Sequence, residues 1–163
     1  MTVGICGAGT MGRGIAIAAA RAGHEVILFD ISAEMEDKSI TYVHKQLDKA
    51  VEKKKMSERD SELAKKRVRF SSDLESMKDA DLVVEAILEK VEPKHDLFTK
   101  LESIVSKKAI LATNTSSISI AALARPLQHK ERFVGLHFFN PAHIMKLVEV
   151  IRGPLTNDAT VRT

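Results

Sequence analysis

The sequence predicts an α/β fold, because short apolar runs typical of strands alternate with helix-like segments along its 163 residues. The first apolar run, residues 3–6, is followed by a glycine-rich turn at 7–12 and by small apolar residues at 15–22. A second apolar run, residues 25–29, ends in Asp30. A strand, a glycine turn, a helix and a second strand in this order are typical of a Rossmann-type, doubly wound, mostly parallel sheet.

Each glycine of the turn has a separate task in a dinucleotide-binding loop. Gly7 makes the tight turn, Gly9 lets a pyrophosphate approach bare backbone, and Gly12 lets helix and strand pack closely. The anion would bind the unpaired N–H groups and positive dipole end of the following helix. Asp30 lies 18 residues beyond Gly12, where a carboxylate meets the ribose hydroxyls and repels a 2′-phosphate. The pattern therefore predicts NAD as the cofactor, in preference to NADP.

A helical excursion over about residues 33–67 is expected after the second strand. Ser32 can cap its first helix, in which apolar residues recur at helical spacing over 40–51, and a charged helix at about 58–67 runs back. Because both helices are polar, we expect an αα-hairpin that stands off the sheet. Residues 45–69 include ten basic and five acidic side chains. They either solvate an exposed helix or bind a phosphate-rich ligand, and nucleic acid is a weaker candidate because aromatic residues are scarce there.

Two further buried strands are expected over residues 81–86 and 108–113. Glu85 and Glu89 lie at or beyond the carboxyl end of the first, where open α/β sheets bind ligands. Four small polar residues, 114–117, follow the second. They either cap the next helix or offer hydroxyl and amide groups to a substrate.

The last third of the chain contains a candidate acid–base pair. Residues 132–139 are expected to form a strand that includes His137, and residues 146–151 a strand that carries Glu149 in an apolar run. If these strands fold back antiparallel around His143, His137 and Glu149 become cross-strand neighbours, and a buried carboxylate would need such a partner. The carboxylate would hold one imidazole nitrogen and leave the other free as a general acid or base. From these residues alone, His137 could equally be a satisfied core histidine.

Composition limits the other classes of protein. The hydrophobic fraction of 44% is ordinary for a globular protein, and no apolar run approaches the roughly 18–20 residues that cross a bilayer. A formal charge of +3 is too small to imply nucleic acid. Cys6 is the single cysteine and cannot form an internal disulfide, which favours the reducing cytoplasm. No histidine stands at metal-ligand spacing, so no metal is expected.

Five segments of the sequence stand in a specific order. They are Gly-Ala-Gly-Thr-Met-Gly-Arg-Gly-Ile-Ala at 7–16, Leu-Val-Val-Glu-Ala-Ile at 82–87, Asn-Thr-Ser-Ser at 114–117, Gly-Leu-His-Phe-Phe-Asn-Pro at 135–141 and Lys-Leu-Val-Glu-Val-Ile at 146–151. Together they resemble the N-terminal, NAD-binding domain of the L-3-hydroxyacyl-CoA dehydrogenases, including the bacterial 3-hydroxybutyryl-CoA enzymes. The resemblance covers essentially the whole chain, and the run from 135 to 151 is its most specific part.

The resemblance implies oxidation of the 3-hydroxyl of an acyl-CoA to a ketone with hydride transfer to NAD, or the reverse, as in fatty acid β-oxidation. His137 would take the hydroxyl proton, Glu149 would pair with it, and Ser116 would hydrogen-bond the reacting oxygen near the nicotinamide. The helical excursion resembles a clamp over coenzyme A, with Lys54 as the expected phosphate contact. The expected cofactor contacts are Gly7, Gly9, Thr10, Met11, Gly12, Asp30, Glu89, Lys94, Ser116 and Asn140.

Members of this family continue into a C-terminal helical domain that makes the dimer, closes over the acyl chain and donates a substrate-binding asparagine. We expect residues 1–163 to form one NAD-binding domain without that helical domain, and the complete enzyme to be a homodimer that binds neither nucleic acid nor membrane. Two other functions stay open. The chain could bind NAD or CoA as a module without activity in isolation, or belong to a related dehydrogenase that acts on a free hydroxy acid or sugar acid.

Overall fold

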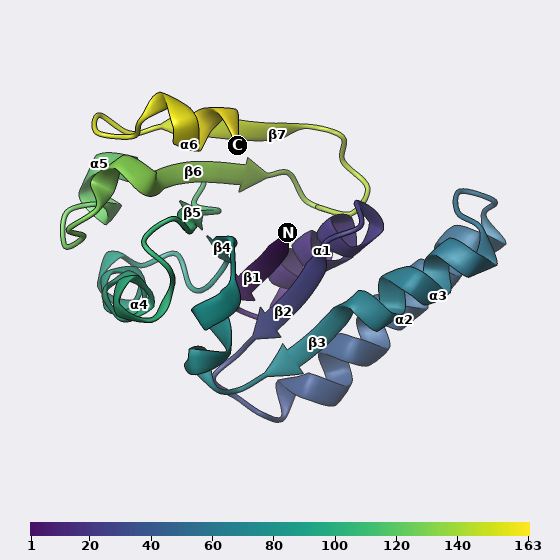
Figure 1. The fold of residues 1–163 in the computed structure, drawn as a ribbon. Coiled ribbons are helices and arrows are strands. Elements are labelled where there is room, and N and C mark those ends of the chain that lie inside the picture. Colours follow the sequence, from purple (N-terminus) through teal and green to yellow (C-terminus); the bar gives the residue numbers. More distant parts are fainter.

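Seven strands form one sheet in the computed structural model, which describes all residues 1–163 (Figure 1). The order is β3-β2-β1-β4-β5-β6-β7, and every neighbouring pair is parallel except β6 and β7, which are antiparallel. The strands are β1 (Thr2–Cys6), β2 (Glu25–Phe29), β3 (Val68–Ser71), β4 (Leu82–Glu85), β5 (Ile110–Thr113), β6 (Phe133–Phe138) and β7 (Val148–Arg152). The predicted Rossmann-type sheet with an antiparallel end is confirmed.

Helices cover both faces of the sheet. They are α1 (Thr10–Arg21), α2 (Met35–Glu52), α3 (Glu58–Arg67), α4 (Val91–Ile104), α5 (Ile120–Leu123) and α6 (Asp158–Arg162), with short 3₁₀ turns at η1 (Leu74–Asp79) and η2 (Lys130–Arg132). The first three helices pack on one face, whereas α4, α5 and η1 pack on the other. Side chains alternate between the two cores along each strand, as Ile5 and Cys6 do, because successive residues of a strand point to opposite faces.

The chain leaves the carboxyl ends of β1 and β4, which are neighbours, toward opposite faces of the sheet. From β1 it enters α1 on one face, and from β4 it enters α4 on the other. This divergence is a topological switch point, where open α/β sheets form a crevice for ligands. The glycine turn after β1 and the segment after β4 therefore line one crevice.

The glycine turn is held by close backbone contacts. Gly7 has φ of +106°, which favours glycine, and its N–H donates to the carbonyl oxygen of Phe29 at 2.8 Å. A Cβ at Gly12 would lie 1.7 Å from the Gly7 carbonyl oxygen, whereas a Cβ at Gly9 would meet nothing within 4 Å. Gly12 is therefore required by packing, and the space over Gly9 is open, as the dinucleotide motif predicts.

The helical hairpin occupies the predicted region but differs from the prediction in two details. Ser32 does not cap it, because α2 begins at Met35 with Glu34 as a cap residue that makes no side-chain bond. The hairpin also does not stand wholly off the sheet, since Val43 and Leu47 are fully buried in the core that α1, α2 and α3 share with the sheet. A narrow apolar stripe suffices to dock α2, and only the tip of the hairpin projects from the domain (Figure 1).

Replacing Gly12 by Ala should destabilise the fold, because the added methyl group has no space. Overpacking of this kind costs about 1–3 kcal/mol, so we expect the thermal midpoint to fall by roughly 5–10 °C. Gly9→Ala is the matched control, because its φ of −72° and open surroundings accept a side chain. Thermal unfolding followed by circular dichroism would compare the two variants, and equal midpoints would contradict this account of the turn.

Candidate active site

The glycine turn and Asp30 form the cofactor end of the crevice. One carboxylate oxygen of Asp30 accepts the Ala8 N–H at 2.8 Å, and the other accepts the Ser32 N–H at 3.1 Å, so the carboxylate is fixed beside the turn. Thr10 and Met11 open α1, whose first turn has neither an acidic residue nor a side-chain cap. The N–H groups at this helix end are thus available to a pyrophosphate.

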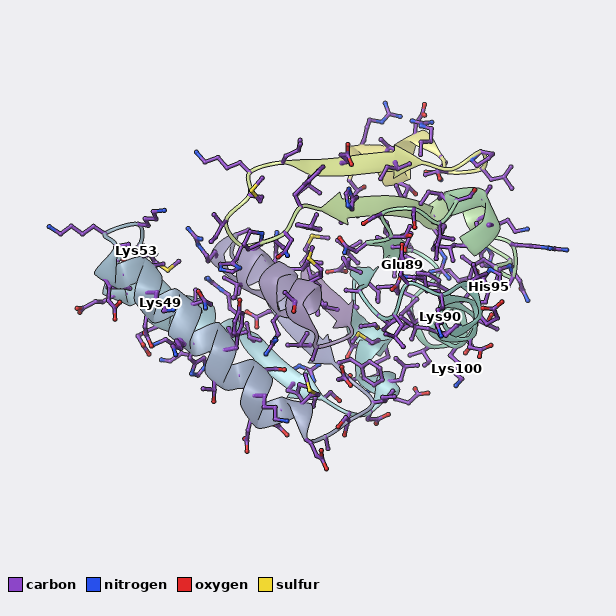
Figure 2. The ribbon with its side chains drawn as sticks, turned by 180° about the vertical axis from the view of Figure 1, so that it is seen from behind. Lys49, Lys53, Glu89, Lys90, His95 and Lys100 are labelled. Carbon is purple, nitrogen blue, oxygen red and sulfur yellow. The ribbon has the colours of Figure 1, made fainter.

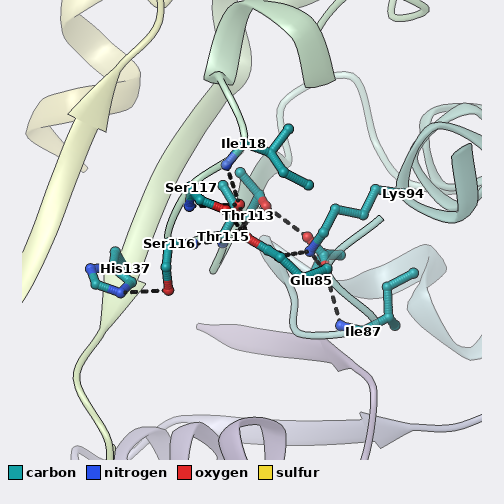
Figure 3. A network of polar contacts seen from close by, with 10 residues as sticks. Glu85, Ile87, Lys94, Thr113, Thr115, Ser116, Ser117, Ile118 and His137 are labelled. Atoms are coloured by element: carbon teal, nitrogen blue, oxygen red, sulfur yellow. Dashed lines mark hydrogen bonds and ion pairs between the residues drawn. The ribbon is translucent and has the colours of Figure 1, made fainter. Parts of the chain in front are cut away.

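His137 lies between a serine and a carboxylate at the carboxyl end of β6. Its register partner on β7 is Glu149, and the His137 Nδ1 to Glu149 Oε2 distance is 2.8 Å. Its other ring nitrogen, Nε2, is 3.1 Å from Ser116 Oγ (Figure 3). With the carboxylate accepting from Nδ1–H, Nε2 is an acceptor and Ser116 donates to it. The three predicted catalytic residues therefore form one connected group.

The pairing of His137 with Glu149 is confirmed, but the predicted burial of Glu149 is wrong. Its side chain is 50% exposed, and every residue of β7 is exposed. Strand register, not the need of a buried charge, brings the two side chains together. The alternative of a core histidine is also wrong, because His137 is only half-buried, with its side chain 18% exposed.

Glu89 holds the loop that carries Ser116. Its Oε1 accepts the Ser116 N–H at 3.1 Å, the Thr115 hydroxyl and the Ser117 hydroxyl at 3.4 Å. Burial acts to raise the pKa of Glu89, but hydrogen bonds from Thr115 and Lys94 outweigh it and hold the pKa below its ordinary value. The polar segment 114–117 does not cap the next helix, because the cap residue of α5 makes no side-chain bond.

Behind Glu89 lies a buried ion pair that sequence reasoning missed. Lys94 Nζ is 2.5 Å from Glu85 Oε1 and 3.1 Å from Glu89 Oε2. Glu85 also accepts the Thr113 hydroxyl at 2.7 Å and the Ile87 N–H at 2.8 Å (Figure 3). The signal that could have found it is an acidic residue that ends an apolar strand, where a buried carboxylate needs donors.

The remaining predicted site residues are less tightly placed. Asn140 is exposed just after β6, in a cis peptide bond with Pro141. Lys54 lies at the tip of the hairpin, between α2 and α3, and has φ of +53°. Lys53, which precedes Lys54 in the chain, and Glu89 of the candidate site lie on opposite sides of the view in Figure 2. Cys6 is fully buried, and burial together with the nearby Glu85 carboxylate raises the pKa of its thiol far above the ordinary value.

A basic cleft of about 500 Å³ lies between the end of α1, the tip of the hairpin and the loop before β7. Its charged lining includes Arg21, Lys55 and Lys146, against the single carboxylate of Asp60. Arg21 also donates to the His143 carbonyl oxygen at 3.3 Å, which holds the loop against α1. The cleft thus has an excess of positive charge, and its lining includes Lys55, the residue that follows the predicted phosphate contact Lys54.

Neither a cluster of metal ligands nor a membrane-spanning helix is present. No three His, Cys, Asp or Glu side chains gather closely enough to hold a metal ion. None of the helices combines the length and apolar character needed to cross a bilayer.

An open glycine turn with a fixed aspartate, and a histidine held between a serine and a carboxylate at the same edge of one sheet, define a dinucleotide-dependent dehydrogenase domain. Comparison with known sequences agrees. The family model "3-hydroxyacyl-CoA dehydrogenase, NAD binding domain" matches residues 2–163, and the chain belongs to this family. The prediction of NAD as the cofactor is confirmed.

Known relatives carry related names. The chain is 46% identical over 162 residues to a probable 3-hydroxybutyryl-CoA dehydrogenase of Deinococcus radiodurans, covering 99% of this chain and 58% of that protein. It is 46% identical over 155 residues to 3-hydroxyadipyl-CoA dehydrogenase of Escherichia coli K12, covering 95% of this chain and 33% of that protein.

A solved structure is closely similar as well. The crystal structure of 3-hydroxybutyryl-CoA dehydrogenase from Escherichia coli K12 superimposes with a TM-score of 0.97 at 44% identity, over 99% of this chain and 34% of that one. The chain thus spans between a third and three fifths of the length of these three proteins.

The hydrogen bonds to Glu89 should make the folded domain sensitive to acid. Because the folded-state pKa is lowered, this stabilisation is complete above the unfolded pKa of about 4.3 and is lost as the pH falls through the lower folded value. We expect the free energy of unfolding to fall less steeply with acid below about pH 4.3 in Glu89→Gln than in the unaltered protein. Urea titrations across this range would measure it, and parallel curves would contradict the assignment.

Proposed function

We propose that the protein with this domain is an NAD-dependent L-3-hydroxyacyl-CoA dehydrogenase, which interconverts L-3-hydroxyacyl-CoA and 3-oxoacyl-CoA. The observation that carries the proposal is His137, 2.8 Å from Glu149 and 3.1 Å from Ser116. This arrangement on an NAD-binding fold suits removal of a hydroxyl proton. The family and the names of the relatives support the acyl-CoA substrate.

In the proposed reaction, His137 Nε2 takes the proton of the 3-hydroxyl while C3 of the substrate loses hydride. NAD, when bound, supplies the hydride acceptor. Glu149 stabilises the imidazolium that forms and keeps its ring oriented. Without substrate, Ser116 donates its hydroxyl hydrogen to His137 Nε2. With substrate bound, it would donate this hydrogen to the reacting oxygen instead. In the reverse direction the same nitrogen returns the proton, so one residue serves as base and acid.

The expected cofactor contacts extend this proposal. Gly7, Gly9 and Gly12 with the start of α1 would hold the pyrophosphate, and Asp30 the adenosine ribose. Glu89, Ser116 and Asn140 would face the nicotinamide half. We further propose that residues 1–163 act as a single NAD-binding domain, and that the complete enzyme is a homodimer. The buried, unpaired Cys6 supports the cytoplasm as its compartment.

A module that binds NAD or CoA without catalysing a reaction is the alternative that a direct assay decides. NADH formation from L-3-hydroxybutyryl-CoA, followed at 340 nm beside calorimetric NAD binding, separates the two. Binding without turnover favours the module. Turnover of a free hydroxy acid or sugar acid, without competition by CoA, favours the related dehydrogenase.

Removing the imidazole should abolish most of the activity and leave cofactor binding intact. We expect His137→Ala to lower kcat by roughly 10²–10⁴-fold, because it loses general base catalysis, with an unchanged Kd for NAD. His129→Ala is the matched control, since His129 also lies 3.3 Å from a carboxylate, that of Glu131, but belongs to η2 and its flank. Comparable kcat values for the two variants would contradict the assignment of the base.

The proposed phosphate contact of Lys54 can be tested through substrate affinity. Loss of an exposed lysine–phosphate pair is worth up to about 1 kcal/mol, so Lys54→Ala should raise the KM for the CoA ester about two- to fivefold, mainly at low salt. The KM for NAD should stay constant. Lys78→Ala, an exposed lysine on η1, is the control. The same experiment on Lys55, which lines the basic cleft, would show whether the contact lies one residue further on.

A further inference from the structure

We propose that Lys94 is a positioning residue: it orients Glu89, which in turn fixes Ser116 against His137, and Glu85 anchors the lysine. The proposal deepens the proposed function, because it concerns the same serine and histidine. Its geometric part, the placement of Ser116, does not depend on any reaction and can be tested without cofactor or substrate.

Lys94 is placed to act through protein groups. Its side chain is 1% exposed, and both contacts of its ammonium are carboxylates, at 2.5 Å and 3.1 Å. A buried ammonium is costly unless it is paired, and the two carboxylates supply that pairing. The charge therefore lies beneath Glu89, on the protein side of the crevice.

Glu85 sets where this ammonium lies. Its side chain is fully buried, and it is bonded to the end of β5 through Thr113 and to the turn after β4 through Ile87. The first contact belongs to the central sheet, and the second to the turn that directly follows β4. The position of Lys94 Nζ is thus defined relative to β4 and β5, and the lysine transmits that position outward.

Glu89 is the element that needs such support. Its side chain is 42% exposed and lies on the connection between β4 and α4, so solvent would compete for its carboxylate. The lysine holds one carboxylate oxygen, Oε2, which leaves Oε1 to accept from Thr115, Ser116 and Ser117. The two oxygens of Glu89 therefore join the buried pair to the serine loop.

The series of contacts ends at the proposed catalytic group. The backbone N–H of Ser116 is bonded to Glu89, and its hydroxyl lies 3.1 Å from His137 Nε2 (Figure 3). A displacement of the loop by about 1 Å can cost as much as 10²-fold in rate when it misplaces a reacting group. Loss of the lysine should therefore lower kcat.

The test uses a double variant, Glu85→Gln with Lys94→Met, so that no buried charge is left unpaired. The amide of Glu85→Gln can accept from Ile87 and donate to Thr113, and methionine fills the space of the lysine stem. Glu85→Gln alone is the matched control, since its amide oxygen can still accept from Lys94 and so keeps the lysine in contact with Glu89. Ser116→Ala is the reference for a lost hydrogen bond at His137 Nε2.

The readout is the ¹⁵N resonance of His137 Nε2 in histidine-labelled protein without NAD, at one pH. We expect the double variant to move this resonance toward its position in Ser116→Ala, and Glu85→Gln to leave it in place. An unmoved resonance in the folded double variant would overturn the proposal. Glu89→Ala cuts the same series of contacts at a partly exposed side chain; if it folds but leaves the resonance unmoved, the proposal also fails, whether or not the double variant folds.

A second measurement separates positioning from direct cofactor contact. If Lys94 acts only through Glu89, the double variant loses roughly 10- to 100-fold in kcat, and its Kd for NAD rises no more than that of Glu89→Ala. If Lys94 instead binds NAD, the Kd rises beyond that of Glu89→Ala and the cofactor-free resonance stays unmoved, which overturns the proposal. Absence of turnover in the unaltered protein would count against the proposed function alone, because the resonance requires no reaction.

Discussion

The register between β6 and β7 is the constraint on which the candidate site depends. It sets Glu149 directly opposite His137, and the same pairing continues from Phe138 with Val148 to Val134 with Arg152. Because side chains alternate along a strand, a slip of one residue would turn the glutamate to the other face of the sheet. Backbone hydrogen bonds far from the histidine therefore determine whether its ring has a carboxylate partner.

The site joins parts of the chain with different degrees of support. The glycine turn is fixed by backbone packing that leaves no room for a side chain at Gly12. The serine loop is held by Glu89, which is itself bonded to the buried pair of Lys94 and Glu85. Glu149, by contrast, lies on the exposed strand β7 at the edge of the sheet, and His137 lies on the neighbouring strand β6. The acid–base group is thus built at a boundary between a rigid crevice and an accessible surface.

The Rossmann-type sheet, the glycine turn, Asp30 and the pairing of His137 with Glu149 could be predicted from the sequence, because each depends on local spacing or on one hairpin. The place of Ser116 beside His137 is implied only by the resemblance to the family, since no spacing along the chain links the two. Prediction from the sequence failed where burial depends on the rest of the fold. Glu149 is flanked by apolar residues in the sequence but lies on β7, in which every residue is exposed. Its exposure could therefore not be predicted from the residues beside it. The contact of Lys94 with Glu85 joins a helix to a strand end through side chains nine residues apart, and no periodicity encodes such a meeting.

The single cysteine has a practical consequence. Cys6 ends the central strand β1, is fully buried, and has a thiol that burial keeps protonated, so alkylating reagents should find neither access nor a thiolate in the native domain. Its rate of labelling then reports how often the middle of the sheet opens. The domain therefore contains an internal probe of its own unfolding, placed directly before the glycine turn at which the cofactor would bind.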